Sequence, residues 1–422
     1  MRLTPSFLLP ALLALAGCAT PPPPAASTTA AASAAIPATA PRAPLLLISI
    51  DGLRPDDLAA APTLQRLAAD GVRAQWMTPS YPSLTFPNHY TLVTGLRPDH
   101  HGIVHNTMQD PVLGAFSLNR RDAVGDGRWW QAGEPIWVSA HKAGLRTATM
   151  FWPGSEAAIA GVRPDEWHPF DATRSAQGRV DTVLGWLDRP PAQRPAFMTL
   201  YFDQVDHAEH DAGPGSAPAR AAVAEVDAAL AALLAGLRQR GLDQTINLVI
   251  VSDHGMAAVP AGQQIAVDTM VPATLAQAVT TGQVVGFRPL LGQEAAAEAR
   301  LLGRHDHYSC WRKEALPERW HYGRHPRIPP IICQMDEGWD AVGGGWKGRA
   351  GTGTRGSHGY DPALPSMRAV FIAHGPAFRA GTVLPPFDNV DVYPLLAHLL
   401  GIPAAPNDGS LAPLLPALRT AP

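Results

Sequence analysis

The chain has 422 residues, 46% of them hydrophobic, and a formal net charge of −3. This length supports a sizeable core in one large domain or two modest ones. The small net charge and the scattered Lys and Arg residues argue against a surface that coats nucleic acid.

The N-terminus predicts a targeting segment rather than part of the fold. The positively charged Arg2 precedes an apolar run over residues 7–16. The following Leu15-Ala16-Gly17-Cys18 resembles a bacterial lipobox, in which the cysteine is lipidated. We expect a lipoprotein signal peptide over residues 1–17, a lipid on Cys18 and, because Ala19 follows, an outer-membrane anchor facing the periplasm or the cell surface. The alternative is an ordinary secretory signal with an incidental cysteine. The apolar run is too short to span a bilayer as a stable helix, so we expect membrane contact only through the lipid.

Residues 18–43 are mostly Ala, Pro, Thr and Ser, which predicts a disordered tether with little to bury. In the remaining segment, 44–422, apolar runs typical of buried strands alternate with amphipathic stretches typical of helices. The expected strands are 45–50, 147–151, 196–202, 246–251 and 369–373, and the expected helices are 61–70, 219–240 and 390–400.

This alternation predicts an α/β fold, with a mostly parallel sheet and helices on both faces. Ligands of such sheets bind beyond the carboxyl ends of the strands. Residues 282–354, rich in Gly, Arg, His and Trp, break the pattern and predict an insertion or cap. Cys310 and Cys333 lie within it, and in an exported protein we expect a disulfide worth about 3 kcal/mol rather than two free thiols.

Six carboxylate and imidazole side chains follow expected strand ends or lie in a glycine-flanked loop, and these are Asp51, Asp206, His210, Asp253, His254 and His358. A helical turn would aim Asp206 and His210 at one point, because they are four residues apart. Mixed Asp and His donors suit zinc, although manganese and cobalt accept the same ligands. Taken singly, each residue has an ordinary explanation as a turn or surface residue, so only their combination indicates a metal site.

Thr85 lies in the unusual string Thr85-Phe86-Pro87-Asn88-His89. A threonine hydroxyl becomes a nucleophile only if a base or a metal lowers its pKa, and the donors above could supply that metal. The alternative is a loop or helix-cap threonine.

Eight motifs together resemble the nucleotide pyrophosphatase/phosphodiesterase family of the alkaline phosphatase superfamily, over roughly residues 44–405 and in the family's order. They are Leu47 to Gly52, Thr85-Phe86-Pro87-Asn88-His89, Thr94-Gly95-Leu96, His101-Gly102-Ile103-Val104-His105-Asn106, Phe151-Trp152-Pro153-Gly154, Asp206-His207-Ala208-Glu209-His210, Asp253-His254-Gly255-Met256 and Gly356-Ser357-His358-Gly359-Tyr360.

The resemblance implies an alkaline-phosphatase-like core and two zinc ions per chain, one held by Asp51, Thr85, Asp253 and His254 and the other by Asp206, His210 and His358. It implies that Thr85 attacks phosphorus and becomes covalently linked to the nucleotide, and that Asn106 donates its amide to a phosphate oxygen. Without the resemblance, Asn106 would be interpreted as a helix or turn cap.

The same resemblance implies that Phe86 and Tyr201 stack the nucleobase, with Leu118 and Phe170 lining the pocket. Without it, Tyr201 would be interpreted as a strand-core residue and Phe86 as a packing residue. Glu209 departs from the family, because many relatives have glycine there, and we expect it to be tolerated if it points outward.

The predicted function is zinc-dependent hydrolysis of phosphodiester or pyrophosphate bonds in small nucleotide substrates, releasing nucleoside 5′-monophosphates. Two alternatives remain open. The same metals could serve a phospholipid-headgroup, glycerophosphodiester or phosphonate hydrolase, or the chain could be a surface lipoprotein that only binds metal.

Overall fold

A central sheet of eight strands organises the computed structural model, which describes residues 43–343 and 353–419. The strand order is β20-β2-β19-β9-β1-β8-β6-β7, and only β19 runs antiparallel to its neighbours. This confirms the prediction of an α/β fold with a mostly parallel sheet. The strands are β1 (Leu45–Ile50), β2 (Val72–Ala74), β6 (Thr147–Met150), β7 (Glu166–Trp167), β8 (Phe197–Phe202), β9 (Asn247–Val251), β19 (Phe371–His374) and β20 (Thr382–Leu384).

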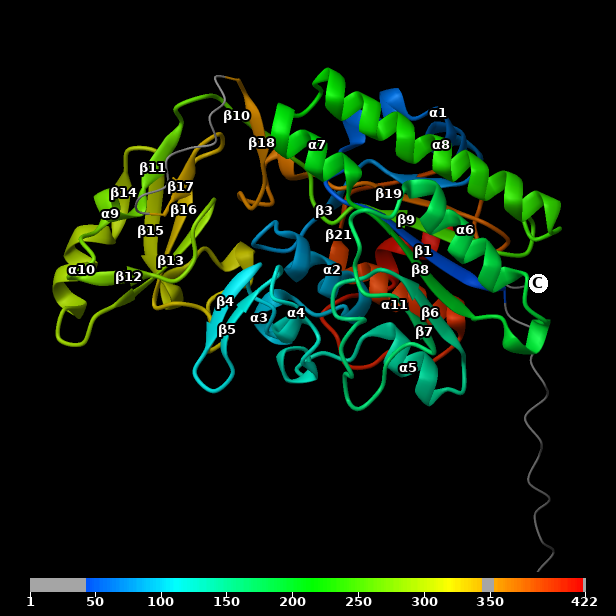
Figure 1. The fold of residues 1–422 in the computed structure, drawn as a ribbon, viewed down its shortest axis with the longest axis horizontal. Helices are drawn as coiled ribbons and strands as arrows, with labels where there is room; N and C mark the ends of the chain where they lie inside the picture. Colours follow the sequence, from blue (N-terminus) through cyan, green and yellow to red (C-terminus); the bar gives the residue numbers. More distant parts are fainter. Residues whose placement is uncertain (1–42, 344–352, 420–422) are drawn as a thin grey trace, which may run out of the picture. The chain divides into compact units, whose positions relative to one another are not determined.

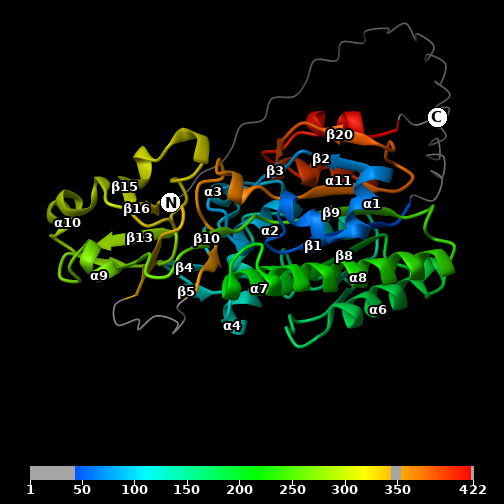
Figure 2. The same cartoon turned by 90° about the horizontal axis from the view of Figure 1, so that it is seen from above.

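Helices cover both faces of this sheet (Figure 1). Alternate residues of β1 divide between two cores: Leu45 and Leu47 pack on one side, Leu46 and Ile48 on the other. The first core includes residues of α2 (Thr85–Thr94), α5 (Ile136–Lys142) and α11 (Val392–Leu400). The second includes α1 (Pro62–Asp70), α6 (Ala176–Leu187) and α8 (Ala217–Gln239), and α6 and α8 lie side by side (Figure 2).

Three adjacent parallel strands, β8, β1 and β9, end at the same edge of the sheet. Asp51 follows β1 directly, Asp253 follows β9, and α7 (Gln204–Ala212) begins just after β8. Gly52 turns the chain here with φ 73°, and a Cβ at this position would meet Asp206 atoms at 3.2 Å. Glycine therefore permits both the turn and the close approach of Asp206 to the backbone at Gly52.

A second sheet lies apart from the central one (Figures 1 and 2). We call the segment that carries it, residues 264–342, the lobe. Its antiparallel strands, in the order β12-β13-β16-β15-β14, are β12 (Ala276–Ala278), β13 (Val284–Pro289), β16 (Ile331–Met335), β15 (Tyr308–Arg312) and β14 (Gly303–His305). Cys310 and Cys333 face each other across β15 and β16 and form the predicted disulfide. The lobe sheet begins at Ala276, earlier than the expected boundary at residue 282.

A two-stranded antiparallel ladder, which we call the neck, joins the lobe to the core. It pairs β10 (Ala257–Val259) with β18 (Arg355–Ser357). The neck follows His254 on the outgoing strand and precedes His358 on the returning one, so it brackets the lobe between two predicted metal ligands.

The predicted signal peptide, Cys18 and most of the tether lie outside the described residues. Within the described part of the chain, no helix combines the length and apolarity needed to cross a membrane. All described residues belong to the unit that spans Pro41–Pro422.

Candidate active site

Four of the predicted donors, which we call the inner set, converge at the edge of the sheet. They are Asp51, Thr85, Asp253 and His254. The Nε2 atom of His254 lies 3.0 Å from Asp253 Oδ2, 3.2 Å from Thr85 Oγ1 and 3.5 Å from Asp51 Oδ1. Residues from two strand ends and the first turn of α2 therefore meet within reach of a single cation.

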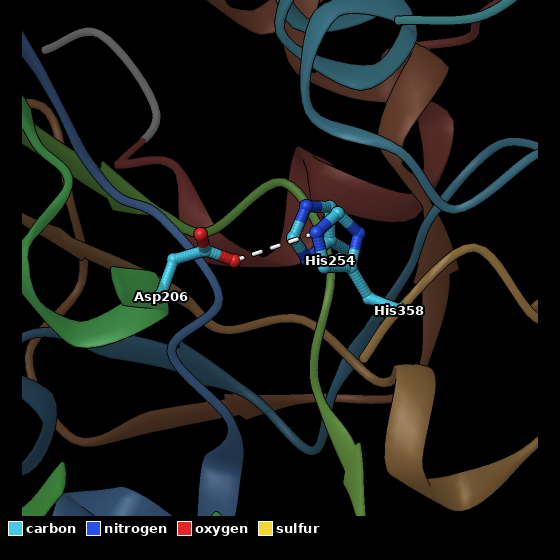
Figure 3. A group of neighbouring side chains, drawn as sticks. All are labelled: Asp206, His254 and His358. Atoms are coloured by element: carbon cyan, nitrogen blue, oxygen red, sulfur yellow. Dashed lines mark ion pairs between the residues drawn. The ribbon is translucent and has the colours of Figure 1, made fainter. Parts of the chain in front are cut away.

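The three other donors, the outer set, lie beside them. His358 Nε2 is 3.1 Å from His210 Nε2. Asp206 Oδ1 lies 3.5 Å from the His358 nitrogen, and Asp206 Oδ2 lies 3.5 Å from the His210 nitrogen. Figure 3 shows the Asp206 carboxylate directed at the imidazoles of His254 and His358. The rings of His254 and His358 stack with centroids 3.6 Å apart, so the two sets are immediate neighbours.

The three imidazoles are oriented by backbone carbonyls. The Nδ1 atoms of His254, His210 and His358 lie 2.9–3.0 Å from the carbonyl oxygens of Gly255, Gly356 and Ser83, respectively. A carbonyl only accepts, so each Nδ1 carries the proton and donates it. In the neutral ring, Nε2 then presents a lone pair to the site, which is the tautomer that binds metals.

Unpaired acceptors make these two sets a fitting site for divalent cations. Two neutral Nε2 atoms 3.1 Å apart cannot hydrogen-bond each other. Among the described residues, no well-oriented donor serves the buried oxygens Asp51 Oδ1, Asp206 Oδ1 and Asp253 Oδ2. Buried acceptors without donors are costly, and cations between them would remove that cost.

The titration behaviour of the site reflects crowded charge. Burial raises the pKa of Asp51 well above its usual range, and the charges of Asp253 and Asp206 add to this. Burial also acts to raise the pKa of Asp253, but His254 and His89 outweigh it and hold that pKa well below its usual range. Burial and the neighbouring His254 and His210 lower the pKa of His358 well below its usual range, which keeps its Nε2 lone pair available.

His89 is a member of the site to which the sequence assigned no role. Its Nδ1 lies 2.9 Å from the Thr85 carbonyl and 3.2 Å from Asp253 Oδ2, and its Nε2 lies 2.8 Å from Ser49 Oγ. Both ring nitrogens are thus engaged by protein atoms, so His89 orients Asp253 and the first turn of α2 rather than adding a metal donor. Its place one turn after Thr85 is the only sequence signal that could have indicated this.

Asn106 lies next to the first turn of α2. Its Oδ1 accepts a hydrogen bond from the Phe86 N–H at 2.9 Å, which is the capping contact that the alternative interpretation predicted. This contact fixes the amide orientation and directs Nδ2, which has two further protons to donate, away from Phe86.

A cavity of about 440 Å³ opens on the inner set. Phe86, Leu118, Phe170 and Tyr201 all line it, together with Asp51, Thr85 and Asp206. Phe86 and Phe170 are half-buried, whereas Tyr201 is only 7% exposed and donates its hydroxyl to Asp51 Oδ2 at 2.6 Å. Tyr201 therefore supports a donor of the inner set, a contact that the sequence did not predict.

A second cavity, of about 530 Å³, opens on the outer set. Asp206, His210 and His358 line it, and the lobe contributes Gln283 and Asp340. Asp206 and His207 line both cavities, so a substrate with two halves could extend from one to the other. A third cavity, of about 970 Å³, is lined by none of the seven donors.

Glu209 corrects one expectation, because it does not point outward. Its side chain is fully buried on α7, with Oε1 3.6 Å from Arg54 Nη2. Burial, aided by the charge of Asp57, raises the pKa of Glu209 to about 8, and the nearby Arg54 offsets this only in part. The larger side chain is accommodated because it extends toward Arg54, away from the donors.

Solved structures share this fold. The human ectonucleotide pyrophosphatase/phosphodiesterase 5 has a TM-score of 0.84 and 33% identity, covering 89% of this chain and all of that one. An inactive murine form of the same protein, in complex with AMP, gives 0.83 and 32% over the same shares. Fold and site together define a hydrolase of the alkaline phosphatase superfamily.

Residues 45–361 match the sequence profile of the family described as type I phosphodiesterase / nucleotide pyrophosphatase. The chain belongs to this family, as its motifs indicated. An uncharacterised pyrophosphatase/phosphodiesterase of Schizosaccharomyces pombe is 36% identical over 89% of this chain and 80% of its own length. The bovine ectonucleotide pyrophosphatase/phosphodiesterase family member 3 is also 36% identical, over 87% of this chain but only 43% of its own length.

Proposed function

We propose that this protein is a zinc-dependent nucleotide phosphodiesterase that releases nucleoside 5′-monophosphates through a covalent threonine intermediate. The observation that carries the proposal is the convergence of seven donors in two adjacent sets beside an aromatic cavity, with Thr85 Oγ1 3.2 Å from His254 Nε2. One similar structure, that of a murine relative in complex with AMP, supports a nucleoside monophosphate as the group recognised.

Two zinc ions would be held, one by the inner set and one by the outer set. When bound, such ions lower the pKa of a coordinated hydroxyl and neutralise charge on phosphoryl and leaving-group oxygens.

The residues of the chain then act in two steps. Thr85 Oγ1, having lost its proton to solvent, attacks phosphorus, and the leaving oxygen departs with the electron pair of its bond and takes up a proton from solvent when its acidity requires one. Water next cleaves the phosphorus–Oγ1 bond, returns a proton to Thr85 and frees the nucleoside 5′-monophosphate. Asn106 donates from Nδ2 to a non-bridging oxygen, and its Oδ1 contact with Phe86 keeps this donor fixed in both steps.

The base-bearing half of the substrate would occupy the 440 Å³ cavity, and the leaving group would face the second one. Phe86 and Phe170 are the better stacking pair, because Tyr201 is more buried and its hydroxyl is engaged by Asp51. Stacking tolerates different bases, so we expect little base preference.

We further propose that the protein is exported and anchored through a lipid on Cys18. The Cys310–Cys333 disulfide supports an oxidising compartment. Labelled palmitate should be incorporated, and Cys18→Ala should abolish the incorporation; a label that persists in this variant would exclude the anchor.

The test of function is turnover of p-nitrophenyl thymidine 5′-monophosphate by metal-replete protein that lacks the lipid segment. Thr85→Ala should lower kcat by at least about 10³-fold, because no other hydroxyl replaces the nucleophile. Acid-quenched wild type should carry a nucleotidyl group on Thr85 by mass spectrometry. Thr182→Ala, on α6 and away from the site, should leave turnover unchanged. A loss of less than tenfold in Thr85→Ala would overturn the assigned nucleophile.

A further inference from the structure

Phe170 forms one wall of the 440 Å³ cavity from a loop without regular structure, between β7 and α6. Its ring meets Phe151 edge-on at a centroid distance of 5.3 Å and Tyr201 at 5.9 Å. These edge contacts leave the ring partly open toward the cavity. Because the loop has no ladder or helix to hold it, the place of this ring depends on other contacts.

Two charged side chains hold the backbone of Phe170. The Phe170 N–H donates to Glu156 Oε1 at 2.8 Å, and Arg121 Nη2 donates to the Phe170 carbonyl. Arg121 Nη1 in turn donates to Glu156 Oε1 at 3.0 Å and to Oε2 at 3.3 Å. We call this closed arrangement of three residues the Phe170 clamp.

The clamp belongs to the cavity wall itself. Arg121, Glu156 and Phe170 all line the cavity, and the Arg121 guanidinium lies 5.9 Å from the Phe170 ring centroid. An exposed ion pair alone contributes little, and the Arg121 side chain is 54% exposed. The Glu156 side chain is only 13% exposed, and it accepts from both a cation and a backbone N–H. Hydrogen bonds to a charged, partly desolvated acceptor are the stronger kind, so Glu156 should matter more than Arg121.

We propose that Arg121 and Glu156 are positioning residues that set how tightly the enzyme holds the base-bearing half of its substrate. They act through Phe170 rather than on phosphorus, because the seven donors lie on other segments of the chain. Both Glu156 oxygens are already engaged by the protein, so this carboxylate supports a stacking wall instead of selecting a base by its edge. This inference rests on the proposed function.

The test compares two diesters that differ in the base. Glu156→Ala should raise KM for p-nitrophenyl thymidine 5′-monophosphate about tenfold, the scale of one lost stacking contact, and leave kcat within about twofold. Methyl p-nitrophenyl phosphate, which has no base, should be hydrolysed with unchanged constants. Arg121→Ala should act in the same direction but less. Glu156→Gln, which keeps an oxygen for the Phe170 N–H, should fall between wild type and Glu156→Ala.

A double-mutant cycle separates positioning from general damage. Phe170→Ala alone should raise KM for the nucleotide ester, and adding Glu156→Ala should raise it no further. AMP binding, measured by calorimetry, should weaken in parallel with the rise in KM. Arg120→Ala is the matched control, because Arg120 precedes Arg121 and pairs with Asp122 instead. This variant should leave KM and kcat unchanged for both diesters.

The two proposals fail in different ways. Equal losses on both diesters, or additive effects of Glu156→Ala and Phe170→Ala, would overturn the positioning role while leaving Thr85 chemistry intact. Turnover by the Thr85→Ala variant at the wild-type rate would overturn the proposed function. The AMP affinities of the clamp variants would then still decide whether the clamp holds the base.

Discussion

The inner and outer donor sets are neighbours, yet they are built very differently. Three of the four inner donors lie in the core: His254 and Asp253 are fully buried and Asp51 is 2% exposed, whereas Thr85 is half-buried and lines the cavity. Three further contacts support it, from the Tyr201 hydroxyl, the Gly52 N–H and His89. The outer set is more open, since the side chains of Asp206 and His210 are 15% and 33% exposed and only that of His358, at 6%, is buried.

This contrast indicates a division of labour. Under the proposed function, a largely buried set suits the nucleophile, whose position must not vary. A more open set suits departure of the leaving group and entry of water. We therefore expect damage to the inner set to cost more than equivalent damage to the outer set.

The largest effect should come from His254→Ala. It should lower kcat/KM by at least about 10³-fold and also destabilise the fold by about 3 kcal/mol, because Asp51 and Asp253 lose a buried partner. His210→Ala should lose the outer metal and much activity but keep most of the stability. Turnover, metal content and thermal unfolding measure the difference, with the remote His374→Ala as control. Equal destabilisation by the two variants would show that the sets are not distinct.

A smaller effect is expected from Tyr201→Phe, which removes only the donor to Asp51. Losing such an outer-shell bond typically weakens metal affinity or activity about tenfold or more. Zinc-chelator competition should show weaker binding at one site and unchanged binding at the other. Tyr308→Phe, in the lobe, should have no effect. Uniform weakening at both sites would argue against selective support of the inner set.

The smallest effect concerns Glu209, which lies between Asp206 and His210 on the outer-set side. Its pKa is raised from an ordinary 4.5 to about 8, so the folded state binds a proton that the unfolded state releases. Stability should thus be highest below pH 4.5 for this group and fall as pH rises toward 8, by up to about 1.4 kcal/mol per unit. Glu209→Gln should remove this slope. Urea unfolding of chelator-treated protein from pH 5 to 8 tests it, and parallel curves for the two proteins would refute it.

Much of the central sheet could be predicted because its strands are continuous apolar runs. β1 begins and ends at the predicted residues, and β8, β9 and α8 shift by at most two residues at either end. Sequence reasoning did not predict α2, because Pro87 and a polar start obscure its pattern. Proline is tolerated in a first turn, where its missing N–H would have had no helical partner.

The direction in which a site residue's side chain points was harder to predict than the residue's place in the sequence. The donors were found from their residue types and their places after strand ends. By contrast, the buried direction of Glu209 depends on Arg54, which is far away in sequence, and the hydroxyl contact of Tyr201 depends on how β8 lies beside β1. Such contacts are set by tertiary packing, and no local pattern encodes them.

The neck gives the molecule a modular property. Ala257 pairs with Ser357, so the chain leaves the core just after His254 and returns just before His358, whatever lies between. Residues between these two histidines also pack on the core, because Val284, Trp320 and Ile328 belong to its first hydrophobic cluster. Evolution, or a protein engineer, could therefore vary the outer strands β12 and β14, which contribute no residue to that cluster, while the proposed metal donors keep their places.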